Sequence, residues 1–184
     1  MFCWRTIFAH FPSLLILSML FTQPANADSA TEIDLRVQAA LTRFTTEVDA
    51  GSQFIAVAKG LLVFPRVIKA GFGIGGEYGE GALVIGGKTI DYYSTAAASI
   101  GFQIGAQTKT TILLFLEQEA LEKFRASDGW EVGVDAAVAL VEIGSGGSID
   151  TTNMTDPVIG FVLNNKGLMY NLTLEGSKMT KIEK

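Results

Sequence analysis

Glycines at alternate positions, next to an apolar strand-like segment, most constrain how this chain folds. The apolar residues 61–64 precede Pro65, and the sequence Gly71-Phe72-Gly73-Ile74-Gly75 follows shortly after. Side chains of a β-strand alternate between its two faces, so these glycines share one face while Phe72 and Ile74 occupy the other. A face without side chains allows another backbone or a ligand to approach closely. The run therefore predicts β-structure with one bare face.

The rest of the chain divides into two helices and a series of strands. Apolar residues recur at helical spacing over residues 30–50 and predict an amphipathic helix, which Asp28 or Ser29 caps and Gly51 ends. A second helix is expected at residues 117–126. The expected strands cover residues 61–64, 67–74, 81–85, 96–107, 110–116 and 130–143, and a closing hairpin joins residues 157–163 to 168–175.

The 20 glycines among these short strands indicate a strongly curved or closed sheet. We therefore predict a single α+β domain that is mostly β: a curved or barrel-like antiparallel sheet with an N-terminal amphipathic helix and one further helix. The sequence also predicts a tight turn at Gly86-Gly87-Lys88 and a turn through residues 77–81. A short helical turn is expected at residues 52–58, and a frayed end over residues 178–184.

The N-terminus resembles a secretory signal. Arg5 supplies a positive charge, residues 7–21 are mostly apolar, and Ala25-Asn26-Ala27 has the small residues of a signal-peptidase site. The apolar stretch is short for a membrane span. We expect residues 1–27 to be removed, which leaves residues 28–184 as one domain in the periplasm or outer envelope. An uncleaved N-terminal anchor is the alternative.

Removal of this segment takes away the only histidine, His10, and the only cysteine, Cys3. The remaining chain then has no Ser-His or Cys-His pair for nucleophilic catalysis and no disulfide. The formal net charge of the whole chain is −5, and loss of Arg5 makes it one unit more negative. Such a charge argues against a general nucleic-acid binder, which would be basic. We expect a protein that is no enzyme, uses no cofactor and holds no metal.

Two glycine motifs match nucleotide-binding patterns only formally. Gly71-x-Gly73-x-x-Gly76 has the spacing of the dinucleotide fingerprint, which requires a helix at its end, but the acidic and turn-like residues 77–81 follow instead. Gly87-Lys88-Thr89 resembles the end of a phosphate-binding loop, yet Ala82 stands where that loop needs its first glycine. We interpret both as glycines of strands and turns.

Asp135 interrupts a predicted core strand in Val134-Asp135-Ala136. A buried carboxylate needs hydrogen bonds or a cation to stay charged, so a functional role for Asp135 is one interpretation. An aspartate on the outer face of a half-buried strand is the favoured alternative. Catalysis by Glu77, Glu80, Asp91 or Asp135 is formally open, but no sequence feature pairs Glu77 or Glu80 with a partner that would raise a pKa.

Lys59, Arg66 and Lys69 form the nearest approach to a basic cluster. They flank the first apolar strand and can donate charge-assisted hydrogen bonds to an anionic headgroup, with Phe72 and Phe102 as candidate apolar contacts. The alternative is that the three cations are solvated at strand edges and that both phenylalanines belong to the core. For the N-terminal helix we favour packing on the sheet over membrane insertion, because its polar side is not basic.

Several segments in order resemble the SYLF domain, also called the Ysc84 or DUF500 domain. Its opening motif is similar to Ala58-Lys59-Gly60, Phe64-Pro65 and the segment from Lys69 through Gly76. Three later segments match in the same order, and with the first they cover most of residues 40–177. These later segments are Ser99-Ile100-Gly101-Phe102-Gln103-Ile104-Gly105-Ala106-Gln107, Gly133-Val134-Asp135-Ala136, and Lys166-Gly167-Leu168 leading to Leu174-Glu175-Gly176-Ser177.

The resemblance implies lipid binding without catalysis. Eukaryotic members of the family bind phosphoinositides and some bind actin, whereas bacterial members look secreted. Two segments depart from the family pattern: Asp91-Tyr92-Tyr93-Ser94 replaces a Trp-Ser-x-Pro segment, and Glu142-Ile143-Gly144-Ser145-Gly146 replaces a Gly-Pro-x-Gly stretch. We expect altered headgroup selectivity if either lies at the site. The expected function is binding of anionic phospholipid in the bacterial envelope, without actin; a structural module that binds an envelope protein is the alternative.

Overall fold

A computed structural model describes residues 28–141, 156–164, 167–168, 174 and 176–184. Within these ranges only the backbone is described at residues 71–74, 99–106 and 167–168. The predicted signal at residues 1–27 lies outside the described residues, as does nearly all of the loop at residues 144–156 and the end of the closing hairpin.

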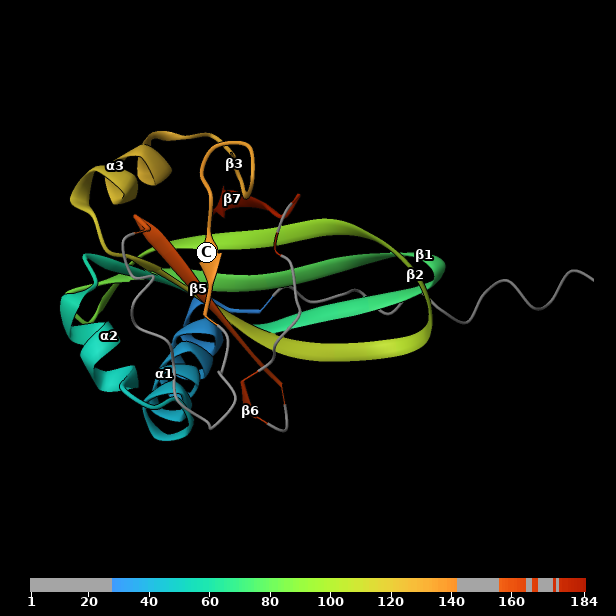
Figure 1. The fold of residues 1–184 in the computed structure, drawn as a ribbon, viewed down its shortest axis with the longest axis horizontal. Coiled ribbons are helices and arrows are strands. Elements are labelled where there is room, and N and C mark those ends of the chain that lie inside the picture. The colour runs from blue at the N-terminus through green and yellow to red at the C-terminus, as the bar shows by residue number, and fades with distance from the viewer. Residues whose placement is uncertain (1–27, 142–155, 165–166, 169–173, 175) are drawn as a thin grey trace, which may run out of the picture.

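The described chain forms three helices and one curled sheet of seven strands (Figure 1), which confirms the predicted fold class. The strands follow the spatial order β3-β7-β2-β5-β4, with β1 paired to β2 and β6 paired to β5. The helices are α1 (Ala30–Glu47), α2 (Gly51–Val57) and α3 (Gln118–Ala126), and the strands are β1 (Gly60–Ile85), β2 (Lys88–Phe115), β3 (Trp130–Glu131), β4 (Ala139–Leu140), β5 (Val158–Asn164), β6 (Gly167–Leu168) and β7 (Lys178–Ile182).

The sheet is built on one very long hairpin of β1 and β2, with 26 and 28 residues. Gly86 and Gly87 join the strands with φ values of 58° and 77°, the left-handed conformations that a two-residue hairpin turn requires. Pairing runs from Ile85 and Lys88 at the turn to Gly60 and Phe115 at the open end. Several strands that the sequence predicts as separate therefore form two continuous ones.

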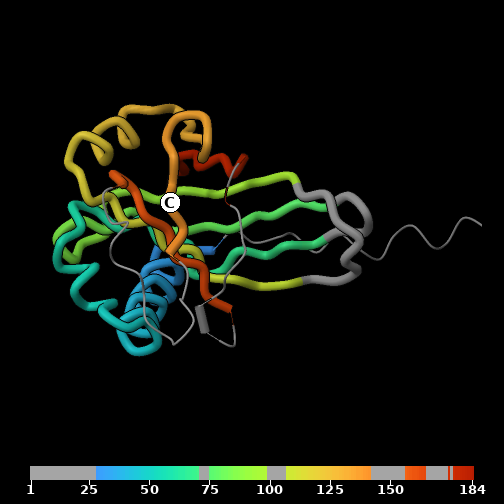
Figure 2. The backbone as a smooth tube through the Cα atoms, viewed as in Figure 1, coloured from blue at the N-terminus to red at the C-terminus, as the bar shows by residue number. Residues whose placement is uncertain are grey.

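The hairpin folds back on itself, so that the returning half of β1 lies beside the first half (Figures 1 and 2). Gly79 and Gly81 make this approach possible. A Cβ atom on Gly79 would lie 2.7 Å from the carbonyl oxygen of Arg66, and one on Gly81 would lie closer still to that of Val63. The close approach of two backbones across glycines that the sequence predicts for residues 71–75 thus occurs at Gly79 and Gly81, a few residues later in the chain.

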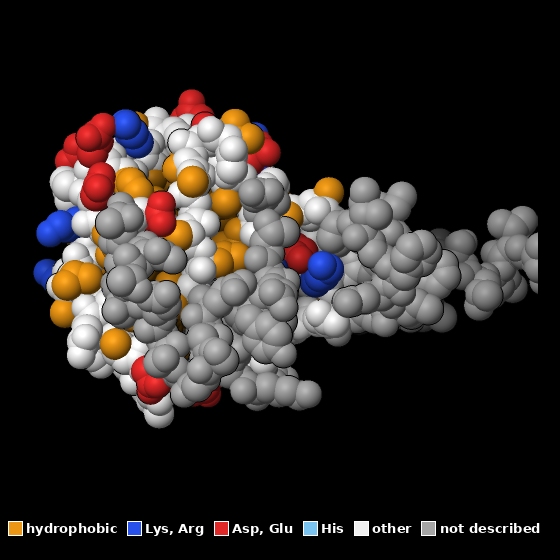
Figure 3. Space-filling view, in the orientation of Figure 1, with side chains coloured by type: hydrophobic (Ala, Val, Ile, Leu, Met, Phe, Trp, Pro, Cys, Tyr) orange, Lys and Arg blue, Asp and Glu red, His pale blue; other side chains and the backbone are white. Residues whose placement is uncertain are grey.

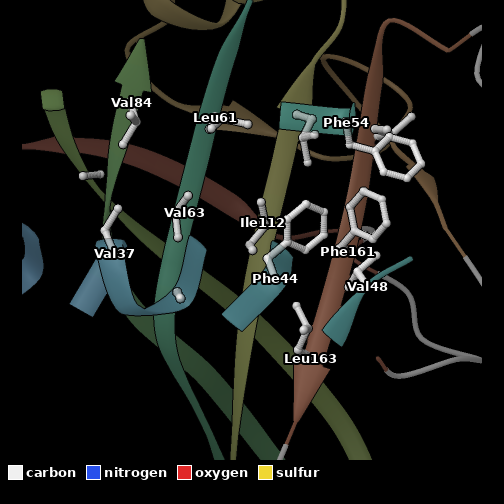
Figure 4. Close-up of a cluster of buried hydrophobic side chains, with 14 of the residues drawn as sticks. Val37, Phe44, Val48, Phe54, Leu61, Val63, Val84, Ile112, Phe161 and Leu163 are labelled. Atoms are coloured by element: carbon white, nitrogen blue, oxygen red, sulfur yellow. The ribbon is translucent and has the colours of Figure 1, made fainter. Parts of the chain in front are cut away.

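Apolar side chains cover both faces of the sheet, because the strands are continuous apolar runs rather than alternating ones. On one face α1 and α2 pack over the first core (Figure 4), where the Phe161 ring lies 4.7 Å from that of Phe44 and 5.0 Å from that of Phe54. On the other face α3, β3 and β7 pack over the second core. The strand residues of the first core are Leu61, Val63, Ala82, Val84, Ile112, Leu114, Ile159, Phe161 and Leu163. Those of the second include Leu62, Phe64, Val67, Leu83, Tyr93, Leu113, Phe115, Trp130, Val158, Val162 and Met179.

The predicted N-terminal helix is confirmed as α1, and its apolar stripe packs on the sheet as favoured from the sequence. The Ser29 side chain caps its start by accepting from the backbone N–H of Glu32. Asp34 fixes the helix to β2, because its carboxylate accepts hydrogen bonds from the hydroxyls of Thr89 and Tyr92 at 2.8 and 3.1 Å. No helix in the described part of the chain is long and apolar enough to cross a membrane.

Four local predictions are wrong. Gly51 begins α2 instead of ending α1, because α1 already ends at Glu47 with Val48 as its C-cap and Ala50, with φ 61°, turns the chain into α2. Residues 77–81 belong to β1 and form no turn. The segment 130–143 contains only the short strands β3 and β4 in its described part, rather than one long strand. Residues 178–182 are not frayed but form β7, which pairs with both β2 and β3.

Candidate functional site

The predicted basic residues do not form one cluster. Lys59 is exposed just before β1, and its backbone N–H donates to the carbonyl oxygen of Phe115 at the open end of the hairpin. At about 3.3 Å per residue, Lys69 lies roughly 30 Å farther along the strand. Arg66 is also exposed, beside an irregularity in the register between Phe64 and Val67. Of the three cations, Lys69 is the one that the structure places in a charged cluster.

That cluster consists of Lys69, Glu77 and Lys109. The Glu77 carboxylate lies 2.5 Å from the Lys109 ammonium and 3.4 Å from that of Lys69. The side chains of Glu77 and Lys109 are only 12% and 11% exposed, whereas that of Lys69 is 40% exposed. Two cations therefore share one carboxylate in a sheltered place, which leaves one positive charge in excess.

The fold of the hairpin brings these residues together. Lys109 on β2 pairs with Val67, and Lys69 pairs with Gln107, two residues away. The two lysines are therefore diagonal neighbours on adjacent strands. Glu77 comes from the returning half of β1, which packs against the first half at Gly79. The three residues thus meet because the hairpin is folded, and an extended hairpin would separate Glu77 from both lysines.

The cluster lies on the same sheet face as the second core. Alternation along the strands puts Lys69 on the side of Val67, Glu77 on the side of Leu83, and Lys109 on the side of Leu113, all three of which belong to that core. Figure 3 shows hydrophobic atoms gathered on the middle of the molecule and acidic and basic side chains side by side at the base of the extended hairpin. The charged cluster therefore lies at the end of a sheet face whose apolar part is buried in the second core.

One buried hydroxyl stands between the apolar and the charged parts of this face. Thr111 lies two residues from Lys109 on β2, is 3% exposed, and its Oγ1 has no hydrogen-bond partner in the described structure. A buried polar atom without a partner costs free energy, so Thr111 is a locally destabilising polar group next to the charged cluster. Lysine ammonium groups are suitable donors for a phosphate or carboxylate oxygen.

Lys109 was not among the residues predicted from the sequence, and Glu77 lies in a strand rather than in the predicted turn. The period-two alternation of β2 gives a usable signal for Lys109, because counting back from Leu113 through Thr111 places this cation on a core-facing position. Glu77 was expected in a turn as a solvated acid, since glycines surround it. Only the packing of the two halves of the hairpin reveals it as a nearly buried carboxylate.

Phe72 and Phe102, the predicted apolar contacts, lie on β1 and β2 between the pairs Gly71–Gly105 and Gly73–Gly101. Their backbones thus fall close together across the hairpin. Their side chains lie outside the described structure, so their contact role stays a prediction.

Asp135 does not occupy a core strand. It is exposed in a turn after β3, and its carboxylate accepts a hydrogen bond of 2.6 Å from the backbone N–H of Glu131. The buried-carboxylate interpretation is therefore wrong, and so is the placement on an outer strand face. Asp135 closes a local turn.

The segment 91–94, which departs from the family pattern, is tied into the structure. Asp91 lies 2.6 Å from the ammonium of Lys181, Tyr92 donates to Asp34, and the Tyr93 ring packs in the second core beside Phe124. Burial raises the pKa of Tyr93. These contacts give the segment a structural role, and altered headgroup selectivity through it stays a prediction.

Nothing in the described residues resembles a catalytic centre. Hydrogen bonds from Arg43 and Lys123 hold the pKa values of Glu47 and Glu119 below the ordinary value. A general acid requires the opposite shift. No group of three or more His, Cys, Asp or Glu side chains is arranged to hold a metal ion in the described residues.

Residues 96–184 match the Ysc84 family, whose description is Las17-binding protein actin regulator. This part of the chain belongs to the Ysc84 family. The match begins within β2 and includes α3 and all the strands from β3 to β7, so it confirms the resemblance seen in the sequence. The family, also called SYLF or DUF500, consists of non-enzymatic binding domains. A search of curated proteins finds no match to this chain.

Proposed function

We propose that this Ysc84 domain binds anionic phospholipid without catalysis, in the periplasm or outer envelope of a bacterium. The observation that carries the proposal is the pair of lysines around Glu77 at the charged end of an apolar sheet face. The two ammonium groups are suitable donors to the phosphate of an anionic headgroup. Membership of a family of binding domains supports the proposal.

In the proposed complex Lys69 and Lys109 donate to the phosphate, and the excess positive charge of the cluster attracts it. Lys69 is the accessible cation, and Lys109 is held in place by Glu77. Arg66 and Lys59 would add positive charge along β1, and Phe72 and Phe102, midway along the hairpin, would meet the acyl region. Protein partners such as actin are not part of the proposal.

Co-sedimentation with vesicles of neutral phosphatidylcholine, alone or mixed with anionic phosphatidylglycerol, tests the proposal. The double variant Lys69→Gln with Lys109→Gln should bind the anionic vesicles about thirtyfold more weakly, since each lysine near an anionic surface contributes about 1 kcal/mol. Lys88→Gln with Lys123→Gln is the matched control: it removes the same charge from two exposed positions, in the hairpin turn and in α3.

Glu77→Gln separates a binding role from a structural one. The change raises the net charge of the cluster by one, so binding to anionic vesicles should increase about fivefold. A cluster that only stabilises the fold would give weaker binding instead. Equal binding to neutral and anionic vesicles would contradict the proposal, as would an equal loss of vesicle binding in the control variant and the lysine variant. Stoichiometric capture of an envelope protein without lipid would favour the alternative function, a structural module that binds an envelope protein.

A further inference from the structure

A second charged cluster lies where Asp28, just before α1, meets Lys184. The ammonium of Lys184 lies 2.6 Å from the Glu80 carboxylate and donates a second hydrogen bond of 2.9 Å to the backbone carbonyl of Asp28. The side chains of Lys184 and Glu80 are only 8% and 10% exposed. Three distant parts of the sequence are therefore joined through one sheltered carboxylate.

Glu80 is the centre of this cluster. Its carboxylate accepts from the hydroxyl of Tyr78 at 2.9 Å, from Lys184, and from the backbone N–H of Asp28. Burial raises the pKa of Glu80, but the hydrogen bonds and the charge of Lys184 outweigh burial and leave the pKa below its ordinary value. The carboxylate is thus ionised and directed at the backbone nitrogen of Asp28.

We propose that removal of residues 1–27 creates a new ion pair, in which the α-ammonium group of Asp28 binds Glu80 and fastens the mature N-terminus to the sheet. The proposal rests on the predicted cleavage after Ala27 and is independent of lipid binding. Hydrolysis by a leader-removing peptidase breaks the bond between the Ala27 carbonyl and the Asp28 nitrogen. Water supplies the hydroxyl for the departing carboxylate, and the free amine takes up a proton.

The charges that surround the site support this pairing. Asp28 forms an ion pair with Arg36, which also binds Glu32 at 2.5 Å on the next turn of α1. Before cleavage the cluster holds the carboxylates of Asp28, Glu32 and Glu80 against the cations Arg36 and Lys184. The new ammonium group adds a positive charge where three side-chain carboxylates outnumber two side-chain cations, so cleavage favours the pairing with Glu80.

The pH dependence has a defined sign. An α-amino group ordinarily has a pKa of about 7.7–8.0, and an adjacent carboxylate raises it. A raised pKa stabilises the fold fully below the ordinary value, and the stabilisation is lost as the pH rises through the pKa of the folded state. Tyr78 also faces Glu80, but burial and its hydrogen bond to Glu80 raise the pKa of its hydroxyl from 10.0, above the range that matters here.

The experiment compares residues 28–184 with a free Asp28 amine and the same chain with that amine acetylated. This segment contains both cores, whose residues lie between Ile33 and Met179. At pH 6.5 the free amine should raise the melting temperature by about 3 °C, and the difference should vanish near pH 10. NMR titration of the Asp28 amine should give a pKa about one unit above the ordinary value, a tenfold shift in its protonation equilibrium.

Glu80→Gln should abolish both differences, whereas Glu119→Gln, which removes an exposed acid of α3, should leave them intact. If Glu80→Gln does not fold, the NMR titration of the free Asp28 amine in the wild-type sequence still tests the proposed ion pair. An ordinary pKa for the Asp28 amine, or a free-amine advantage that persists in Glu80→Gln, would overturn the proposal.

Discussion

Gly81→Ala tests whether the hairpin folds back as described. A Cβ atom at this position would overlap the Val63 carbonyl oxygen and lie 2.8 Å from Cδ1 of Phe64. Both obstacles are rigid, since one is backbone and the other is a fully buried ring. Overpacking of this kind costs about 3 kcal/mol, the upper end of the usual range, because the two halves of β1 must move apart.

Gly76→Ala is the matched control in the same strand. Its nearest neighbour would be the Ala97 carbonyl oxygen at 3.7 Å, an ordinary contact. This change should be neutral or should stabilise the fold by about 0.5 kcal/mol, because alanine reduces the entropy of the unfolded chain.

Urea unfolding followed by the fluorescence of Trp130, which is buried in the second core, measures both variants. With a slope of about 2 kcal/mol per molar, Gly81→Ala should lower the midpoint by about 1.5 M. A loss below about 0.5 kcal/mol for Gly81→Ala, or a larger loss for Gly76→Ala, would refute the close packing of the two halves.

Two further predictions concern the packing of the first core and the stability of the fold at low pH. Phe161→Ala should cost about 3–5 kcal/mol in the same urea assay, since it removes the ring that packs edge-on against both Phe44 and Phe54; a loss below 1.5 kcal/mol would mean that the core is not packed in this way. Because the pKa of Glu80 is lowered, its pairing with Lys184 stabilises the fold above the unfolded-state pKa, and this stabilisation is lost as the pH falls through the folded-state pKa. Thermal melts of Glu80→Gln should therefore show a smaller fall in melting temperature below pH 4.5 than those of the wild type. Parallel curves of melting temperature against pH would contradict this role of Glu80.

The elements follow from the sequence where local signals agree. Helical spacing and a serine cap specify α1, and two glycines at the turn specify the hairpin. The position of Gly79 and Gly81 within a strand was harder to predict, because glycine near acidic residues is also typical of turns. Their role depends on a backbone that is distant in sequence, which no local pattern encodes.

The candidate site was predictable only in part. Lys69 was recognised as a cation beside an apolar strand, but its partners come from the other strand and from the returning half of its own strand. Strand β7 was missed for a similar reason. Its charged sequence Lys178-Met179-Thr180-Lys181-Ile182 has little hydrophobic signal, and pairing on both sides with β2 and β3 makes it a strand.

The length of the hairpin dictates an order of assembly. Contacts at the Gly86-Gly87 turn join neighbours in sequence, whereas the pair Gly60 and Phe115 closes a loop that contains both entire strands. Pairing that zips outward from the turn avoids most of the entropy of that closure. The strands β5 and β7 can dock only onto a completed β2, so the C-terminal segments should be the last to order and the first to detach.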